Sequence, residues 1–568
     1  MQNSRVNAFN DAVIRYRLPV ILATLLISLV ASLGISKLIL RTEFDLYFSD
    51  DDPQLANHRK VTSLFGNGDD FVLLLGKESG NLLNSADLEA IRQITEESRQ
   101  IDFVRRVESV SNAEVAKFSE DEVQISNLIN RSQTDVNPGQ LAATIQSQAN
   151  IYGRLIGKDF NYAFVYLHIY PPDYSFKTIA HVYQQYETLA QQWKLRFPQL
   201  KFYAVGQIPL KQTMIRAMQH DLTKLLPLTV LVGAAMLWML TRSFLSMLAG
   251  SLSVILPSTV AIGIASYFGF VFNQTSIMCA SMIFVISMAD TIHISTSYAL
   301  GCKQGLTSKE AIRQSLDHNF TSVFYTSLTT FVGFLGVMIC DSPPFQLLGG
   351  VAALGILVAW LLVITLLPAL LSYIPPRAFV NTPSTEKSLS ALARFALKHQ
   401  RAFRWSFVVV TGFATLFVFQ NKLNSNPAEY FGPHYQLRQA VDFIQEKSSA
   451  SSQLSIVIDT KVRDGALAFE VADKLIQLEE KLRQDKRIVY AASLYDGVKS
   501  LAGENWNETG FNDTFTLLEM AQKSNDAMRT WLSSDRRYAL ISVGVTRLDN
   551  QGLLDLEQDV YAWLKEQR

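Results

Sequence analysis

The stretch Ser281 to Ser297, SMIFVISMADTIHISTS, places one carboxylic acid, Asp290, inside an otherwise apolar run. An aspartate at the centre of a membrane helix costs about 2.5 to 3.5 kcal/mol on insertion scales, so such a residue usually faces other helices and serves an ion or proton path. Counted from Thr275 at about 1.5 Å per residue, Asp290 lies roughly 22 Å into its helix. The stretch therefore predicts a membrane helix that carries a functional acid.

Long runs without Asp, Glu, Lys or Arg recur along the chain, and most have the length that crosses a bilayer core once as a helix. The longest, Ser243 to Ala289, has a polar break at Asn273 and Gln274 and therefore counts as two helices. The fold class predicted is a polytopic α-helical membrane protein with seven spans, near residues 18–38, 223–241, 245–270, 275–299, 320–340, 347–373 and 403–420.

Composition agrees with this fold class and excludes several functions. Of 568 residues, 48% are hydrophobic and 18% charged, below the roughly 25% charge of soluble domains. Lysine plus arginine and aspartate plus glutamate both total 51, so there is no basic field to attract nucleic acid, which we do not expect as a partner. No metal-ligand spacing links Cys279, Cys302 and Cys340. We expect no metal and no cofactor.

Basic residues mark alternate loops of the predicted bundle. They precede the first span and occupy the loops near residues 242, 303–313 and 377–404, whereas the loops near 273 and 341–345 have none. By the positive-inside rule the basic loops are cytoplasmic, which places 41–221 and 421–568 outside. We therefore expect a multi-pass protein of a bacterial inner membrane with a cytoplasmic N-terminus and large periplasmic domains.

The two large polar regions repeat each other. Tyr47-Phe48 and Tyr430-Phe431, and then the apolar strands 71–75 and 454–458, recur at an offset of 383 residues. The seventh span is therefore a second copy of the first. Strand and helix patterns alternate in both regions, which predicts α+β domains of the ferredoxin-like βαβ kind, with helices on one face of a small sheet.

Several side chains near Asp290 are candidate partners in a proton relay. His293 follows at i+3 on the same helical face, and histidine exchanges protons close to working pH. Thr291 is adjacent, and Thr329 and Thr330 on the fifth span offer hydroxyls if the two helices adjoin. The alternatives are that Asp290 only fixes helix packing, that His293 is a packing residue, and that the threonines bond back to their own helix.

These motifs resemble a known transporter superfamily. The string Asp290 to His293, GLTSKEAI (305–312), TSLTTFVGF (326–334) and PALL (368–371) resembles the resistance-nodulation-division (RND) superfamily. Within it, the chain is most similar to MMPL-type exporters, whose five-helix block also resembles the sterol-sensing domain. The resemblance implies a proton-driven exporter in which the acid of the fourth span, here Asp290, is protonated from one side and releases its proton to the other. The family often has tyrosine after this acid, whereas this chain has Thr291.

On this plan the repeat unit is one span, a porter domain and five spans. The predicted parts are a cytoplasmic N-terminus 1–17, a first transmembrane helix 18–40, a first periplasmic porter domain 41–221, transmembrane helices 2–6 as a sterol-sensing-like block 222–373, a cytoplasmic linker 374–401, transmembrane helix 7 at 402–420, and a second periplasmic porter domain 421–568. Two repeats require roughly 766 residues. We therefore expect the second porter domain to be incomplete.

The function predicted is proton-motive-force-driven export of hydrophobic or lipid-like molecules from the inner membrane or periplasm. The expected partners are that substrate, membrane lipids, and a second copy of the chain or periplasmic accessory proteins. An enzyme is not expected, because neither a nucleotide-binding loop nor a nucleophile motif is evident. Two alternatives stay open: a lipid-binding or sensing protein without pumping, and a translocation auxiliary similar to SecD and SecF.

Overall fold

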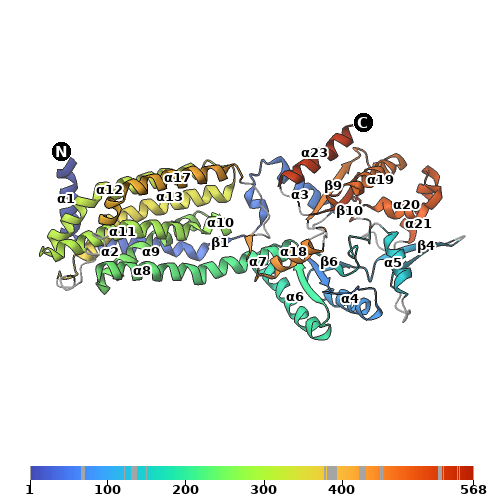
Figure 1. The fold of residues 1–568 in the computed structure, drawn as a ribbon, viewed down its shortest axis with the longest axis horizontal. Helices are drawn as coiled ribbons and strands as arrows, with labels where there is room; N and C mark the ends of the chain where they lie inside the picture. The colour runs from blue at the N-terminus through green and yellow to red at the C-terminus, as the bar shows by residue number, and fades with distance from the viewer. Residues whose placement is uncertain are drawn as a thin grey trace. The chain divides into compact units, whose positions relative to one another are not determined.

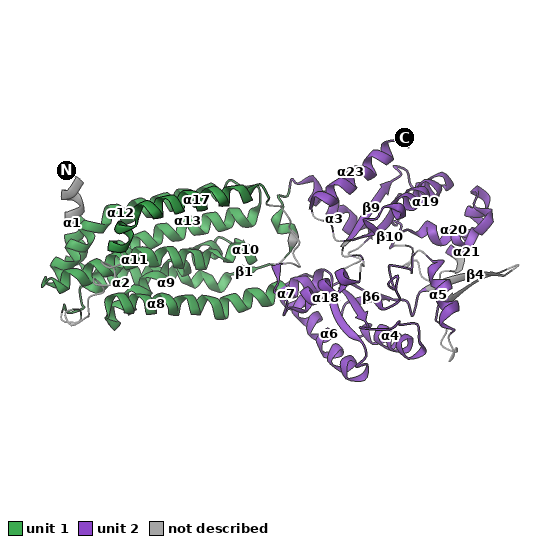
Figure 2. Cartoon of the chain, viewed as in Figure 1, with its two compact units in different colours: residues 1–50, 214–422 green, residues 51–213, 423–568 purple. Residues whose placement is uncertain are grey.

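The computed structural model describes residues 2–41, 43–65, 71–119, 122–129, 137–148, 150–376, 379, 393–420, 430–447, 450, 452–521, 528, 530–546, 548 and 550–566. The chain divides into two compact units (Figure 2). The first combines residues 1–50 with 214–422, and the second combines 51–213 with 423–568. Most of the predicted linker 374–401 lies outside the described residues.

The first unit is a helix bundle. Within the described residues, seven helices are long and apolar enough to cross a membrane, which confirms the predicted count. They are α2 with η1 (Arg17–Lys37), α7 with η3 and α8 (Gln207–Thr241), α9 (Phe244–Tyr267), α10 with α11 (Gln274–Lys303), α12 (Ser308–Val337), α13 with α14 (Pro343–Leu371) and α17 (Gln400–Val418).

The fifth of these helices begins earlier than the apolar run predicts. Thr307 caps α12: its hydroxyl accepts from the backbone N–H of Glu310, and the Glu310 carboxylate accepts from the Thr307 N–H. This reciprocal pair satisfies two N–H groups that a helix start otherwise leaves unpaired. The helix therefore starts at Ser308, whereas hydropathy alone placed the span at 320–340. A further helix, α1 (Gln2–Arg15), packs on α12, where the Asn10 amide donates to Asp317 over 3.0 Å.

The core of the bundle lies among α9, α11 (Cys279–Lys303), α12 and α13 (Pro343–Ile364), which pack side by side (Figure 1). Small residues allow this close approach. A Cβ at Gly355 would lie 2.3 Å from Ile283, and one at Gly349 would lie 2.6 Å from the Phe334 carbonyl oxygen. Glycine is therefore required at these crossings, as is common where membrane helices pack tightly.

The second unit contains two α+β sheets. In the first, β2 (Phe71–Gly76), β3 (Val104–Glu108), β6 (Tyr162–Ile169) and β7 (Lys201–Val205) form an antiparallel sheet in the order β3-β6-β2-β7. The helix α4 (Ser85–Ser98) follows β2, and α6 (Phe176–Arg196) follows β6. This is the βαββαβ order of the ferredoxin-like motif. Trp193 of α6, which is fully buried, stacks on Phe202 of β7 at 6.2 Å. The hairpin β4 (Glu114–Ser119) and β5 (Glu122–Asn127) and the helix α5 (Pro138–Gln146) are inserted between β3 and β6.

The second sheet follows the same order of elements. Within the described residues it contains β9 (Ser452–Asp459), β10 (Ile488–Ala492) and β11 (Tyr538–Val545) in the antiparallel order β10-β11-β9. The helix α19 (Phe469–Gln484) joins β9 to β10, α20 (Leu494–Ala502) and α21 (Glu508–Ala521) follow β10, and α23 (Asn550–Glu566) follows β11. Leu475 and Ile476 of α19 pack in one apolar core with Ile541 and Val543 of β11.

Each copy also contributes one helix to the sheet of the other copy. The helix α3 (Pro53–Phe65), from the first copy, packs through Val61 and Phe65 on Tyr538 and Leu540 of β11. The helix α18 (Gln436–Glu446), from the second copy, packs on β7. Its Phe443 ring lies 5.4 Å from that of Tyr203, and a Cβ at Gly76 would lie 2.5 Å from it. The two copies are therefore joined by an exchange of helices.

Candidate functional site

Asp290 lies in the interior of the helix bundle, between α11 and α12. Its side chain is 3% exposed, and its Oδ2 accepts a hydrogen bond of 3.0 Å from the hydroxyl of Ser327 on α12. Two further polar contacts join the same pair of helices. The Asn319 amide donates to the Ser297 hydroxyl, and the Ser315 hydroxyl donates to the Ile294 carbonyl, both over 2.8 Å. The acid therefore lies in a polar seam along one helix pair.

His293 faces away from this seam. The side chain of His293 is exposed, although it lies only three residues beyond the buried Asp290. Residues at i and i+3 are neighbours on a helix surface, but here the boundary between the buried and the exposed surface of α11 passes between them. The structure thus places His293 near Asp290 in the helix and outside its buried contacts.

The three predicted threonines do not bond to Asp290. Thr329 donates to the carbonyl oxygens of Tyr325 and Thr326, at 2.9 and 3.0 Å, and Thr330 donates to the Thr326 carbonyl at 2.7 Å. Both bond back to their own helix, because the face that α12 turns to α11 carries Ser327 instead. Thr291 is fully buried, and its hydroxyl has no hydrogen-bond partner among the residues that the structure describes.

Ser327 is the partner that sequence reasoning missed. It lies in the quoted stretch TSLTTFVGF, two positions before Thr329. Hydropathy shows that this stretch is a span but does not fix its rotation about the helix axis. The available signal was the pair Ser315 and Asn319, two polar residues one turn apart on the same helix, which indicates the face turned inward. Ser327 continues that face by two further turns.

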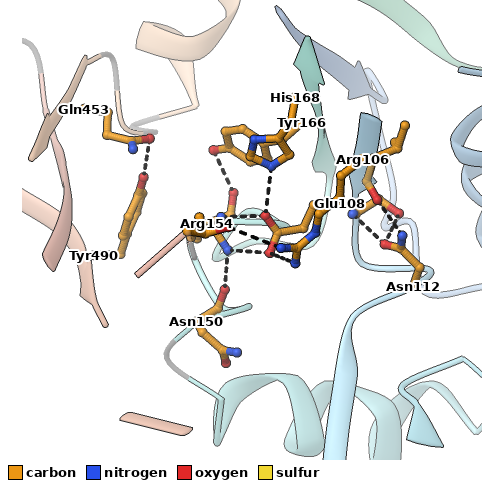
Figure 3. A network of polar contacts seen from close by, with 12 residues as sticks. Arg106, Glu108, Asn112, Asn150, Arg154, Tyr166, His168, Gln453 and Tyr490 are labelled. Carbon is orange, nitrogen blue, oxygen red and sulfur yellow. Dashed lines mark hydrogen bonds and ion pairs between the residues drawn. The ribbon is translucent and has the colours of Figure 1, made fainter. Parts of the chain in front are cut away.

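A second polar cluster lies in the α+β unit (Figure 3). The guanidinium of Arg154 binds the carboxylate of Glu108 through two contacts, Nη2 to Oε2 at 2.8 Å and Nη1 to Oε1 at 3.1 Å. Both side chains are mostly buried. Burial opposes the charged form of Glu108, but the charge and hydrogen bonds of Arg154, together with the His168 ring whose Nε2 lies 3.6 Å from Oε2, outweigh it and hold the pKa of Glu108 well below its usual range. Sequence reasoning did not single out this pair.

The same cluster joins the two copies. The Arg154 guanidinium lies 5.3 Å from the ring centre of Tyr166 in the first copy and 5.2 Å from that of Trp531 in the second. Arg106 donates to the Thr530 hydroxyl over 3.2 Å. Cation–π contacts of this kind are stronger when the cation is desolvated. Arg154 is therefore held by an ion pair within its own copy and by aromatic faces from both.

The two clusters differ in the chemistry they can support. A buried carboxyl bonded to a hydroxyl can hold a proton in one state and accept a hydrogen bond in the other, because a hydroxyl both donates and accepts. The Glu108 and Arg154 pair stays charged and fits a structural role. Within the described residues, no group of three His, Cys, Asp or Glu side chains is placed to hold a metal ion.

Comparison with known proteins agrees with this architecture. The family model described as "MMPL family" matches residues 49–412. A segment of 91 residues is 35% identical to "Putative membrane protein MJ1562" of Methanocaldococcus jannaschii, and it covers 16% of this chain and 24% of that protein. The chain thus matches about a quarter of the length of this relative. Because the family model spans more than half of the sequence, and the seven membrane helices agree with it, the chain belongs to the MMPL family, within the RND superfamily.

Proposed function

We propose that this protein exports hydrophobic or lipid-like molecules from the inner membrane or the periplasm, driven by the proton motive force, and that Asp290 carries the proton. The observation that supports this proposal is the buried carboxyl of Asp290 with its hydroxyl partner Ser327. A buried acid whose hydrogen-bond partner is neutral can exist in either protonation state, whereas a tight ion pair would fix it in the charged form.

The orientation that this function needs is supported by the distribution of charge. Basic residues lie in the loops at one end of the bundle, and such loops are cytoplasmic in membrane proteins. The α+β unit is then periplasmic, at the side where an exporter delivers its substrate. Cysteines introduced at the exposed positions Ser79 and Ser534 should react with an impermeant thiol reagent added outside intact spheroplasts. Reaction only after the membrane is opened would reverse the orientation.

The proton role is tested in proteoliposomes that contain the protein, a fluorescent phospholipid and an imposed pH gradient. Gradient-driven movement of the lipid should fall at least about tenfold in Asp290→Asn, since one group carries the proton, whereas the protein should still fold and insert. Asp341→Asn, which neutralises an exposed loop acid, is the matched control and should transport as the original chain does.

The outcomes also separate the competing functions. Equal transport by Asp290→Asn and the original chain would exclude Asp290 as the proton carrier. Lipid binding that both proteins show, with no movement in response to the gradient in either, would favour a lipid-sensing protein. Crosslinking in cells that traps polypeptide and not lipid would favour a translocation auxiliary.

A further inference from the structure

The start of the helix that carries Asp290 is tied to the segment that follows the first span. The hydroxyls of Tyr47 and Thr275 lie 2.7 Å apart, within hydrogen-bond distance. Beside them, β1 (Ile39–Leu40) pairs in parallel with β8 (Val271–Phe272), and the Arg41 N–H donates to the Phe272 carbonyl over 2.9 Å. All these contacts lie within the membrane unit.

On one side of this tie, a firm helical connection leads to Asp290. Thr275 lies in α10 (Gln274–Ile277), where the Asn273 side chain accepts from the Ser276 N–H at 2.9 Å and the Asn273 N–H donates to the Ser276 hydroxyl at 2.8 Å. This capping box fixes the helix start. Met278 joins α10 to α11 in a right-handed helical conformation. An axial shift of Asp290 therefore moves Thr275, about 22 Å away along the same helical rod.

On the other side, a short stretch of chain leads into the α+β unit. Tyr47 ends the 3-10 turn η2 (Phe44–Tyr47), and α3 begins at Pro53. The residues between them span at most about 17 Å when fully extended. The helix α3 packs on the second sheet through Val61 and Phe65. A displacement of Tyr47 is therefore passed along a short segment of chain to α3, the helix from the first copy that packs on the sheet of the second.

We propose that Tyr47 is a positioning residue that couples the Asp290 helix to the α+β domains. The assignment rests on the proposed function, because it gives the proton-driven displacement of α11 a route to the porter domains. The β1–β8 pairing aligns the two segments, and the bond between Tyr47 and Thr275 attaches α10 itself. Loss of the phenol hydroxyl removes this bond to α10 and leaves the strand pairing in place.

The local bond is tested by hydrogen–deuterium exchange on the full chain in nanodiscs. Tyr47→Phe and Thr275→Val should each raise exchange of the amides in 39–47 and 271–277 by about fivefold, as expected for one lost hydrogen bond. The double variant should exchange no faster than either single one. Additive increases would show that the two hydroxyls do not interact and would overturn the proposal. This measurement does not depend on proton transport.

Transmission is tested by the response of α3 to a change at Asp290. Asp290→Asn should alter exchange in α3 in the original chain, and this response should disappear in the Tyr47→Phe background although α11 still responds. Tyr430→Phe is the matched control, because Tyr430 is the repeat counterpart of Tyr47 and is 66% exposed; it should leave the response intact.

The two proposals fail in different ways. An unchanged α3 response in Tyr47→Phe, or no α3 response in the original chain, would overturn the coupling role whatever Asp290 does in transport. Loss of the α3 response in Tyr47→Phe, together with full transport by Asp290→Asn, would instead remove the proton role and keep the mechanical link.

Discussion

The two α+β copies have the same backbone fold and differ in the side chains that they bury at their common boundary. In each copy, one strand at the edge of the sheet has a register shift directly after its first residue. The shift lies between Val104 and Arg106 in β3 and between Ile488 and Tyr490 in β10. In both, a short bridge precedes the long central strand, Ile156 with Ala163 and Leu532 with Ala539. The positions that correspond are Arg106 and Tyr490, Glu108 and Ala492, Arg154 and Thr530, Tyr166 and Ser542, and His168 and Gly544.

The first copy is thus ionic where the second is neutral. A buried ion pair is tolerated only when each charge has its partner, since several kcal/mol of lost hydration must be recovered. Arg154 meets Trp531 across the boundary and not a second guanidinium. A repeated fold therefore does not require repeated charge: the neutral copy gives the charged one a surface free of like-charge repulsion.

The strongest way to break this asymmetry is to remove one member of the ion pair. Arg154→Ala removes the two short contacts of the buried Glu108 and leaves it only the longer ones, 3.6 Å to His168 and 3.9 Å to Arg106. This loss should lower the free energy of unfolding of the α+β unit by about 3 to 5 kcal/mol. Chemical unfolding followed by tryptophan fluorescence measures this. Arg154→Met combined with Glu108→Leu should recover most of the loss, and a double variant as unstable as the single one would contradict a charge-based cause.

A second prediction concerns the packing of α18 on the sheet of the first copy. Gly76→Ala places a methyl group 2.5 Å from the Phe443 ring, and overpacking of this kind costs about 1 to 3 kcal/mol. We expect faster proteolysis of α18, read by mass spectrometry. Gly497→Ala, at a glycine whose added Cβ would meet nothing within 4 Å, is the control. Equal protease sensitivity of the two variants would show that α18 is not held at Gly76.

The pH response sharpens the contrast between the two copies. The pKa of Glu108 is lowered in the folded state, so its stabilisation is present above the unfolded value of about 4.3 and is lost as the pH falls through the folded value. In the second copy, burial and the neighbouring charge of Asp496 raise the pKa of Glu479 well above its usual range. Its contribution to stability therefore declines as the pH rises from about 4.3 towards that raised value.

Substitution of each carboxyl should separate the two opposite pH dependences of stability. Glu108→Gln should flatten the acid side of the stability profile, and Glu479→Gln should remove the decline on the neutral side. Unfolding midpoints measured from pH 3 to pH 8 provide the check. If both variants changed the midpoint by the same amount at every pH, neither carboxyl would differ in pKa between the folded and unfolded states.

The smallest effect is expected on the neutral side of the boundary. Thr530→Val removes the acceptor of the 3.2 Å bond from Arg106 and should cost about 1 kcal/mol, because the partly exposed guanidinium can turn to water. The same unfolding assay measures this change. A loss as large as that of Arg154→Ala would mean that the two copies contribute equally, and the asymmetry would then be only apparent.

The sequence predicted the features that depend on hydropathy. Charge-free runs of span length identified seven membrane helices, and the quoted motifs indicated the MMPL family. The burial of Asp290 followed from the cost of a carboxyl in a membrane helix. The helix α12 begins about a dozen residues before the predicted span at 320–340, because a capping box, and not hydropathy, sets its start.

Features that depend on rotation and distant pairing could not be predicted in the same way. The face that α12 turns to α11 decides between Ser327 and the threonines, and one span pattern fits several rotations. The pairing of Glu108 with Arg154 joins residues far apart in sequence, and single charged residues in polar regions are ordinarily solvent-exposed. The helix exchange has no local signal, because α3 and α18 would look the same on either sheet.

The exchange of α3 and α18 also sets an order for biosynthesis. The last strand of the first sheet ends at Val205, whereas α18, which packs against it, begins at Gln436, about 230 residues later. At about 5 to 20 residues per second, a ribosome needs about 10 to 50 s to supply that helix. During this interval six membrane spans must be inserted while the apolar surface around Gly76 and Tyr203 stays uncovered. Until its own second copy is made, a newly synthesised first domain therefore presents this surface to any other apolar chain nearby.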